Sequence, residues 1–395
     1  MNVAMVGTFG LYRKGTMRAR ALPLARALAG RGHAVRLLIP PWDSPHESGR
    51  AWTLDGVQVI HVNLPPRVPG VFHIWLTLHL VQQAIALPVD VVHFFKPKAY
   101  AGLTHLVLWW LRLAGLVKRQ LRLVVDEDDW EQAWNDLEAY SPVEKRFFAW
   151  QEVWGLRHAD AVTVASRELM RLVGRTGVPN ERIFYVPNGV WPSAFAECAA
   201  RRAAVYRERA GNTPVLLLYS RFLEFGLERI VRIFRHVVAR QPMARLLVVG
   251  KGLHGQEGEL ANLLREAGLI EKVRFAGWVA YEQLADCFTA ADVALFPFDD
   301  TPVNRSKCSV KLVELLAAGV PVVADAVGQN REYILDGQNG LLVQPEDDHA
   351  FAEAVLRLLQ DASLRARIGE AAARRVRERF EWSHLAAEVE RAYLI

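Results

Sequence analysis

The chain has 395 residues, of which 51% are hydrophobic and 23% charged; it is too long for one core and too apolar to be disordered, so we expect two packed domains. Its net charge of +5 suits an anionic ligand, but the basic residues are spread along the chain, and we expect no nucleic-acid partner. The three cysteines, Cys198, Cys287 and Cys308, form neither a CxxC pair nor a His-Cys cluster, which argues against disulfides and a structural zinc and indicates a reducing compartment.

Short β-branched runs alternate with helix-length segments through the first half of the chain. This alternation is typical of right-handed βαβ units, which build a parallel sheet. The runs cover residues 2–7, 34–40, 89–95, 122–128, 161–166 and 182–189. The first half therefore predicts a Rossmann-like domain.

The same pattern restarts after a join near residues 188–204. The second series of runs covers residues 215–220, 245–250, 273–278, 293–298, 321–326 and 340–345, and the chain past 346 has helical spacing. We therefore predict an α/β chain with two Rossmann-like domains, residues 1–195 and 196–380. A last helix, residues 381–395, is expected to pack back on the first domain.

The N-terminus and the most apolar segments bear on the location of the protein. "MNVAMVGTFG" lacks the basic region, long apolar centre and cleavage site of a signal peptide. Residues 71–87 and 101–117 are interrupted by His, Gln and Arg, which a membrane span rarely tolerates. We expect a cytoplasmic protein without a transmembrane helix.

A glycine-rich loop follows the first predicted strand. "VGTFGLYRKG" places Gly7, Gly10 and Gly15 where backbone amides and a helix N-terminus can approach an anion or a sugar. The spacing is not GxGxxG, and the second strand is followed only by Asp43 beyond two prolines, which disfavours NAD. Either the loop contacts a ligand, or its glycines merely permit a tight turn.

An acidic run, "VVDEDDWE", ends the fourth predicted strand, at the edge where open α/β sheets bind ligands. Asp128 or Asp129 is predicted to orient an acceptor hydroxyl or accept its proton. Metal binding and capping of the next helix are the alternatives. Its acidic residues are Asp126, Glu127, Asp128, Asp129 and Glu131.

A basic stretch, "HFFKPK" at 93–98, also follows a predicted strand end. It offers His93, Lys96 and Lys98 to the same edge of the sheet. The alternative for His93 is packing, because a single histidine after a strand more often packs than reacts.

The loop "DDTPVNRSKCSVK" brings positive charge to the start of an apolar helix that ends at Gly319. Lysines at a helix N-terminus are unfavourable unless something negative lies there, and a diphosphate would supply that charge. Glu314, one turn after Lys311, would then accept bonds from ribose hydroxyls. The alternative is a solvated edge with a Lys311–Glu314 pair. The polar and basic residues of the loop include Asn304, Arg305, Lys307 and Lys311.

Several stretches together resemble the nucleotide-sugar glycosyltransferases of family four, which have the GT-B fold. They are "FYVPNGV", "YSRFLEFGLERIV", "FAGWVAYEQLADCFTAADVALFPF" and "VKLVELLAAGVPVVADAVGQNREYILDGQNGLLVQPED". The resemblance covers most of residues 2–380. It implies two domains facing each other across a cleft, a donor nucleotide against the second domain and an acceptor on the first. Transfer in this family generally retains the anomeric configuration without a metal.

Carried over by position, Arg221 matches the family arginine that touches the donor phosphates. Glu314 matches the second acid of the paired-glutamate motif, near the ribose. Ser306 stands eight residues earlier and the first acid is missing. Phe225 replaces the lysine that many members carry, and Lys307 and Lys311 are expected to supply the lost charge.

A second departure concerns the first domain. Many members have a histidine in the region of the acidic run that contacts the donor sugar, and this sequence has none there. The run instead resembles members with an Asp-x-Asp-Asp-Trp pattern.

We therefore predict that the protein is a glycosyltransferase of glycan biosynthesis. We expect it to use a nucleoside-diphosphate sugar and to need no metal and no other cofactor. The alternatives are a nucleotide-sugar epimerase or a catalytically silent sugar-nucleotide or glycan binding protein. The catalytic assignment is Arg221, Lys307, Lys311, Asp128 and Asp129; the donor-binding assignment is Gly10, Gly15, Asn304, Ser309 and Glu314; the acceptor or sugar side is His93, Lys96 and Glu131.

The acceptor is expected to be a glycan or a lipid-linked molecule, with peripheral contact at the inner face of a membrane. The basis is residues 103–125, in which basic residues lie next to apolar ones, as in an interfacial helix. Burial against the sheet is the alternative. The apolar residues concerned are Leu106, Leu108, Trp109, Trp110, Leu111 and Leu113, and the basic ones Arg112, Lys118, Arg119 and Arg122.

Overall fold

The computed structural model describes the chain apart from residues 12–14, 69, 196, 199–200 and 202–212. Unit 1 comprises Met1–Asn188, Ser306–Cys308 and Trp382–Ile395, and unit 2 comprises Gly189–Arg305 and Ser309–Glu381. Residue 196, where we placed the start of the second domain, and much of the join near 188–204 lie outside the described residues.

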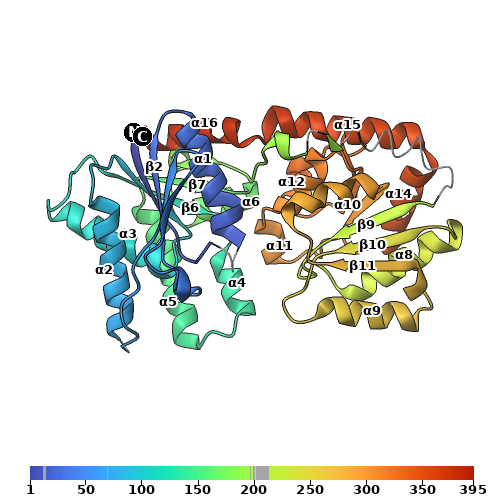
Figure 1. Cartoon of the computed structure of the whole chain (residues 1–395), viewed down its shortest axis with the longest axis horizontal. Coiled ribbons are helices and arrows are strands. Elements are labelled where there is room, and N and C mark those ends of the chain that lie inside the picture. The colour runs from blue at the N-terminus through green and yellow to red at the C-terminus, as the bar shows by residue number, and fades with distance from the viewer. Residues whose placement is uncertain (12–14, 69, 196, 199–200, 202–212) are drawn as a thin grey trace. The chain divides into compact units, whose positions relative to one another are not determined.

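Unit 1 contains a sheet with the strand order β3-β4-β2-β1-β5-β6-β7-β8 (Figure 1). Every neighbouring pair is parallel except β3 with β4. All six strands predicted in the first half are present. The strands are β1 (Asn2–Val6), β2 (Ala34–Ile39), β3 (Ala51–Leu54), β4 (Val57–His61), β5 (Val91–Phe95), β6 (Arg122–Glu127), β7 (Ala161–Val164) and β8 (Ile183–Tyr185).

The hairpin of β3 and β4 was not predicted. Its two-residue turn is Asp55-Gly56, and both residues have positive φ, 46° and 82°, as a type I′ hairpin turn requires. The strand β3 lies at the edge of the sheet and is mostly exposed, so it lacks the continuous apolar run of the other strands.

Helices cover both faces of this sheet (Figure 1). On one face α1, α6 and α16 contact the strands, and on the other α2, α3 and α5 pack side by side. The bounds are α1 (Leu22–Gly30), preceded by a π-helical turn at Met17–Ala21, α2 (Val71–Ile85), α3 (Ala99–Leu113), α4 (Glu131–Leu137), α5 (Pro142–His158), α6 (Arg167–Arg175) and α16 (Trp382–Tyr393).

Local sequence signals explain where several of these helices begin and what they bury. α5 starts after Ser141, whose hydroxyl accepts a hydrogen bond from the Glu144 backbone N–H while the Glu144 carboxylate accepts one from the Ser141 N–H. α16 buries Trp382, Leu385 and Val389 at helical spacing and packs on α1, β7 and β8.

Unit 2 contains a parallel sheet with the order β11-β10-β9-β12-β13-β14. All six strands predicted in the second series are present, so the predicted class, two parallel-sheet α/β domains, is confirmed. The strands are β9 (Val215–Tyr219), β10 (Arg245–Val249), β11 (Val273–Gly277), β12 (Val293–Phe296), β13 (Val322–Asp325) and β14 (Leu341–Val343).

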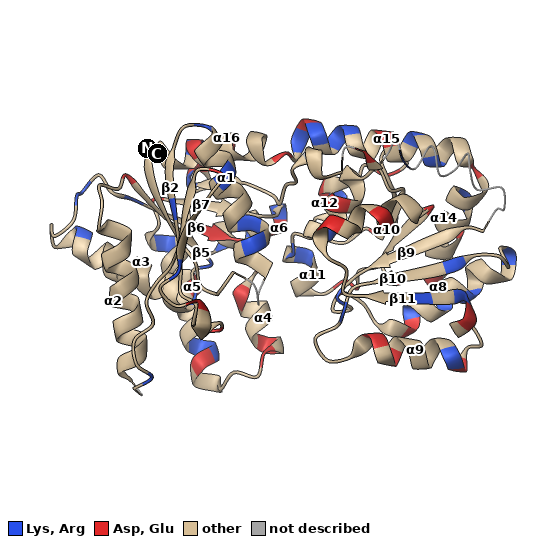
Figure 2. Ribbon diagram, viewed as in Figure 1, with Lys and Arg blue, Asp and Glu red and all other residues tan. Residues whose placement is uncertain are grey.

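In unit 2, α8, α9 and α14 form a connected layer of helices, while α10 contacts β9 and α15 packs on α12 (Figure 1). α8 and α15 carry repeated arginines, seen as blue bands in Figure 2. The bounds are α8 (Leu227–Arg240), α9 (Gln256–Glu266), α10 (Leu284–Ala290), α11 (Pro302–Ser306), α12 (Val310–Ala317), α13 (Asn330–Tyr333), α14 (Asp348–Gln360) and α15 (Ala362–Arg379).

Short 3₁₀ turns complete the described elements. They lie at Pro45–Glu47, Asn180–Arg182, Pro192–Ala194, Ile270–Lys272 and Tyr281–Gln283. Along the described residues, no helix has the length and apolar character that crossing a bilayer requires.

Candidate functional site

Arg221 lies in the loop after β9, at the carboxyl edge of the unit 2 sheet. The neighbouring strand is β12, which leads into α11 and α12 at the same edge. Arg221 is half-buried and has no hydrogen-bond or ion-pair partner among the residues that the structure describes. An arginine in this position offers its full charge to an anion that reaches the sheet edge.

A buried arginine holds the loop that carries Arg221. Arg229, in the first turn of α8, donates to Asp325 at 3.1 Å, to Asp299 at 2.9 Å and to Asp348 at 2.8 Å. Asp299 also accepts from the Gly226 N–H at 2.9 Å. These carboxylates together raise the pKa of Arg229 against the effect of its burial, so the guanidinium stays charged.

Arg229 and Asp325 were not predicted from the sequence. One signal was present: Asp325 ends a buried strand, as the acids of "VVDEDDWE" do. The partner of Asp325 lies 96 residues away in the chain, and no local pattern indicates that distance.

Asn304 positions the α11 loop. Its side-chain amide donates to the backbone oxygens of Glu224, at 2.7 Å, and Asp299, at 2.8 Å, so both N–H groups that we expected at the donor are already used within unit 2. Gly328, at φ 45°, packs closely against the backbone of α11, and a Cβ at this position would lie 2.4 Å from the Arg305 backbone oxygen. Arg305 itself pairs with Asp300 at 2.6 Å.

The first turn of α12 carries Lys311 and no acidic residue. The Lys311 ammonium lies 5.4 Å from the centre of the Tyr219 ring, and the Tyr219 hydroxyl donates to Glu314 at 3.2 Å. Burial, with the Glu314 charge beside it, raises the pKa of Tyr219. Ser309 precedes the helix at its N-cap position and is buried. Lysine, tyrosine and glutamate therefore form one contiguous group at the helix start.

Lys307 lies in the segment between α11 and α12 that is grouped with unit 1. Its ammonium is 5.7 Å from the centre of the Trp134 ring. Lys307 thus lies in a different unit from Lys311, which follows it by four residues in the chain.

In unit 1, the residues after β5 and β6 form a buried ionic cluster. The Lys96 ammonium lies 3.1 Å from Asp128, 3.1 Å from Asp129 and 2.6 Å from Glu131, and Lys98 lies 3.0 Å from Glu131. β5 and β6 are adjacent, so the basic and acidic stretches predicted at the same edge do meet. We call these five residues the Lys96 cluster.

Backbone strain accompanies the Lys96 cluster. Lys96 and Ala99 have φ of 67° and 48°, values that non-glycine residues rarely adopt. The Thr8 hydroxyl holds this turn through the Phe95 carbonyl at 2.9 Å and the Lys98 carbonyl at 3.2 Å. Strain held in place by surrounding bonds is common at functional sites.

Asp129 is the most exposed acid of the Lys96 cluster, with a side chain 22% exposed. Desolvation raises the pKa of Asp129, and although Lys96 opposes this, Asp128 and Glu131 add to it. Glu131 behaves in the opposite way, because Lys96 and Lys98 outweigh its desolvation and lower its pKa. Asp129 is therefore the better proton acceptor of the two, and Glu131 is an ionised anchor.

Two further acids, Glu127 and Glu152, lie buried beside the cluster. Neither carboxylate oxygen of Glu127 has a hydrogen-bond partner among the described residues, and Glu152 Oε1 accepts from the Glu131 backbone N–H at 2.7 Å while its Oε2 has none among them. Burial raises the pKa of Glu152 to about 8 and that of Glu127 well above its ordinary value; neighbouring acids add to both rises, whereas Lys96 opposes the rise at Glu127. Glu152 is therefore mostly protonated at neutral pH.

The prediction that His93 follows a strand end was wrong. His93 lies within β5, fully buried, where its ring nitrogens contact the Tyr393 hydroxyl at 2.9 Å and the Thr163 hydroxyl at 3.2 Å. Burial lowers the pKa of His93 to about 3, and the charge of Arg20 adds to this. His93 is thus a neutral core residue and does not reach a ligand.

The glycine loop has an internal role at Gly10. The Gly10 N–H donates to Asp43 at 3.0 Å, and a Cβ at Gly10 would lie 2.2 Å from that oxygen. The Gly10 N–H is therefore not available to a nucleotide-sugar donor. Gly15 is exposed, with no atom within 4 Å of the place of a Cβ, and residues 12–14 lie outside the described residues.

An aromatic hollow of about 350 Å³ opens in unit 1. The His73 ring nitrogen and the Tyr100 hydroxyl lie 2.8 Å apart within it, and the two rings stack at 5.9 Å. Flat rings beside polar groups are suited to the apolar face and hydroxyls of a sugar or polyol. The hollow is lined by Trp42, Arg67, Val68, Gly70, Phe72, His73 and Tyr100.

An apolar surface lies on the three packed helices α2, α3 and α5. Residues 103–125 do not form the exposed apolar surface that we expected from the sequence. Of the six apolar residues named there, only Trp110 and Leu113 are exposed, while Leu108 is buried. Among the basic residues, Arg112 is paired with Asp160. α2 and α5 contribute the rest, at the spacing of one helix face. The exposed residues are Val71, Ile74, Trp75, Leu78, Trp110, Leu113, Val143, Phe147 and Trp150, which we call the apolar face.

Comparisons with known proteins match both parts of the chain. The model described as "Glycosyl transferase 4-like domain" matches residues 15–189, and that described as "Glycosyl transferases group 1" matches residues 213–361. Between them they cover most of the sequence.

Relatives agree with these matches. A phosphatidyl-myo-inositol mannosyltransferase of Mycobacterium leprae is 28% identical over 405 residues, covering 100% of this chain and 96% of its own. A D-inositol 3-phosphate glycosyltransferase of Streptomyces avermitilis is 39% identical over 144 residues, covering 36% of this chain and 30% of its own.

Solved structures share the fold. Sucrose-phosphate synthase from Thermosynechococcus elongatus has a TM-score of 0.70 at 21% identity, covering 100% of this chain and 98% of its own. HepE from Anabaena in complex with UDP has a TM-score of 0.70 at 18% identity, covering 99% of this chain and 98% of its own.

Proposed function

Since the chain belongs to the group 1 glycosyltransferases of the family-four type and has the GT-B fold, we propose that it transfers a sugar from a nucleoside-diphosphate donor to a lipid-linked acceptor, with retention and without a metal. The observation that carries the donor assignment is Arg221, a half-buried cation without a partner among the described residues, at the sheet edge where α12 also begins.

The donor diphosphate binds at the carboxyl edge of the unit 2 sheet. Arg221 and Lys311 neutralise its charge, and the α12 N-terminus adds backbone N–H groups and the positive end of the helix dipole. As the bond to the sugar breaks, negative charge grows on the diphosphate, so these groups stabilise the transition state more than the ground state. They take over the role that a divalent cation has in other transferases, which is why we expect no metal requirement.

Glu314 accepts hydrogen bonds from the ribose. Its carboxylate already accepts one from Tyr219 at 3.2 Å, which fixes its direction. Asn304 positions this region through its two backbone contacts. Gly10 does not contact the nucleotide-sugar donor in this proposal, because its N–H donates to Asp43.

The acceptor hydroxyl is oriented by Asp129 in unit 1. This carboxylate is the most exposed acid of the Lys96 cluster, and its pKa is raised, so it accepts a hydrogen bond readily. For retention, the new bond forms on the face that the diphosphate leaves, and a phosphate oxygen takes the acceptor proton.

The acceptor is a lipid with a polyol headgroup. The aromatic hollow supplies stacking surfaces, and Arg67 at its wall supplies a positive charge for a phosphate. The relative from M. leprae bears the name phosphatidyl-myo-inositol mannosyltransferase, which supports this acceptor class.

We propose that unit 1 contacts a membrane through the apolar face. Trp75 and Trp150 are 47% and 48% exposed, which is unusual for tryptophan in a soluble surface and typical of interfacial helices. Arg67, Lys118, Arg119 and Arg146 are exposed and supply charge for anionic headgroups.

Calorimetric titration with UDP, GDP and ADP, with EDTA present, tests the donor site. We expect one diphosphate to bind wild type, and Arg221→Ala and Lys311→Ala each to lose about 1.5–3 kcal/mol of binding free energy. Arg235→Ala is the matched control, since Arg235 is an exposed arginine of α8 in the same unit. Unchanged affinity in both site variants would disprove the assignment.

Flotation with anionic vesicles tests the membrane surface. Wild type is expected to float at low salt, and Trp75→Glu, in the middle of the apolar face, to remain in the soluble fraction. Trp278→Glu is the control, because Trp278 is a 72% exposed tryptophan in unit 2. Equal flotation of wild type and Trp75→Glu would contradict the proposal while leaving the donor site untouched.

A further inference from the structure

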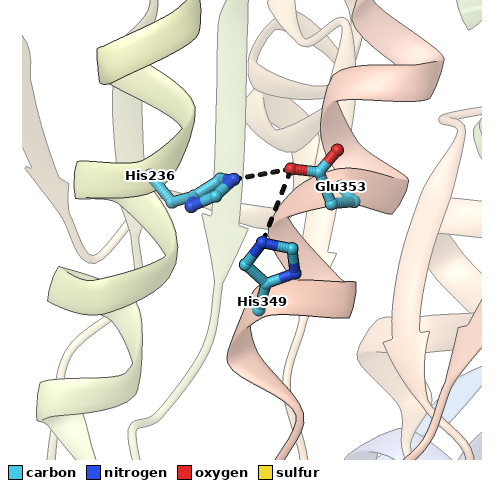
Figure 3. Close-up of side chains that lie close together, drawn as sticks. All are labelled: His236, His349 and Glu353. Carbon is cyan, nitrogen blue, oxygen red and sulfur yellow. Dashed lines mark hydrogen bonds and ion pairs between the residues drawn. The ribbon is translucent and has the colours of Figure 1, made fainter.

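Two histidines and a glutamate lie together on unit 2, and none of them has a role in the proposed transfer. His236 comes from α8, and His349 and Glu353 come from α14 (Figure 3). Their ligand atoms, ring nitrogens and a carboxylate oxygen, all lie within 4.8 Å of one another.

Both imidazoles point toward the same carboxylate oxygen. His236 Nε2 is 2.6 Å and His349 Nε2 4.0 Å from Glu353 Oε1 (Figure 3). His349 and Glu353 are four residues apart and therefore share one face of α14, while His236 faces them because α8 and α14 pack together. The two rings lie 4.7 Å apart.

The other carboxylate oxygen is held separately. Arg240 donates to Glu353 Oε2 at 2.9 Å, which orients the carboxylate and leaves Oε1 for the histidines. The hydrogen bond from His236, with Arg240 adding to it, lowers the pKa of Glu353, so the carboxylate is ionised at neutral pH. A fixed, ionised ligand with a supporting contact is what a metal site needs.

We propose that unit 2 binds one late first-row divalent cation, with Zn²⁺ as the best fit, through His236, His349 and Glu353. Two imidazole nitrogens and one carboxylate oxygen suit this ion, and a water completes the tetrahedron. The ion takes the place of the hydrogen between His236 Nε2 and Glu353 Oε1, and the neutral imidazole then carries its N–H on Nδ1. It links α8 to α14.

Little has to move to form the site. Zinc lies about 2.0–2.2 Å from such ligands, so the His349 ring has to swing toward Glu353 from its present distance. The His349 side chain is 72% exposed, so its ring can turn on the solvent side.

The test is titration of the full chain with ZnCl₂, followed by calorimetry and by thermal unfolding. Wild type is expected to bind one Zn²⁺ and to unfold at a higher temperature with zinc than without. His349→Ala should weaken this binding at least about tenfold and remove the thermal shift. His236→Gln should do the same.

The matched control is His254→Ala, which removes an exposed histidine from the same unit and should bind zinc as wild type does. Because His349 is largely exposed, its variant keeps the fold, and a loss of zinc cannot be attributed to unfolding. If His349→Ala binds zinc as tightly as wild type, or if wild type binds none, the three residues form an ion pair only and the proposal is wrong.

Discussion

Units 1 and 2 both place charged residues after adjacent parallel strands, but they treat the charge in opposite ways. In unit 1 the basic residues after β5 meet the acids after β6, and Lys96, Lys98 and Glu131 are buried against one another. In unit 2 Arg221 follows β9 with no partner among the described residues. The first arrangement stabilises its own loops, whereas the second leaves positive charge for an anion from outside the chain.

The difference follows from burial. A buried charge without a partner is strongly unfavourable, so Lys96 and Lys98 depend on their acids for the fold itself. A half-buried arginine keeps part of its hydration and can remain without a partner until a ligand arrives. Substitutions in unit 1 should therefore change stability, and those at Arg221 should change binding.

The largest effect is expected for Glu131→Ala. It leaves Lys98 buried with Asn135 and two aromatic rings but without a carboxylate, and should lower the free energy of unfolding by about 3–5 kcal/mol. Urea unfolding measures this. Asp136→Ala, an exposed acid of the same helix, is the control and should change little; a similar small change for Glu131→Ala would mean that the cluster is not a source of stability.

Asp129→Asn should separate the two roles within the Lys96 cluster. Asp129 is its most exposed acid, so we expect stability to change little and the transfer rate to fall about 100-fold or more, with diphosphate affinity unchanged. Release of nucleoside diphosphate in the presence of phosphatidylinositol vesicles, and then other lipids, measures the rate. Transfer at the wild-type rate would show that Asp129 has only a structural role.

The buried acids beside the cluster predict a pH dependence of stability. Glu152 has a pKa of about 8 in the folded chain against an ordinary value of 4.5, so its contribution is complete below pH 4.5 and is lost as the pH rises through 8. Between these two pH values, the proton that Glu152 retains in the folded chain makes the free energy of unfolding fall by about 1.4 kcal/mol per pH unit. Glu152→Gln should flatten the curve measured by urea unfolding from pH 5 to 8.5; parallel curves for the two proteins would mean that Glu152 is ionised in the fold.

The smallest effect is expected for Arg221→Ala in the absence of a ligand. Because Arg221 has no partner among the described residues, the free energy of unfolding should stay within about 0.5 kcal/mol of wild type. Arg229→Ala is the informative contrast, since it leaves the buried Asp325 without its cation and should cost about 3–5 kcal/mol. A large loss of unfolding free energy in Arg221→Ala would show that Arg221, like Arg229, stabilises the fold.

The sequence was informative where a signal repeats locally. Buried parallel strands are continuous apolar runs, which is why β1, β5 and β9 could be placed from residues next to one another. The hairpin of β3 and β4 has one exposed strand, and its only clear signal was Asp55-Gly56.

Side-chain partners were harder to predict, because folding brings them from distant segments. That His93 contacts Tyr393, 300 residues away, could not be inferred from "HFFKPK". The same holds for His236 with Glu353, 117 residues apart. Only the meeting of Lys96 with Asp128 and Glu131 was expected, since neighbouring parallel strands end at one edge.

The helix α16 has a consequence for synthesis on the ribosome. It belongs to unit 1, where it covers β7 and β8 and supplies the hydroxyl that contacts His93, yet it follows all of unit 2 in the chain. Unit 1 emerges first but stays incomplete, with part of one sheet face uncovered, until residues 382–393 have been translated. The nascent chain therefore carries an exposed apolar surface through the synthesis of the whole second unit, the interval in which a chaperone would be most needed.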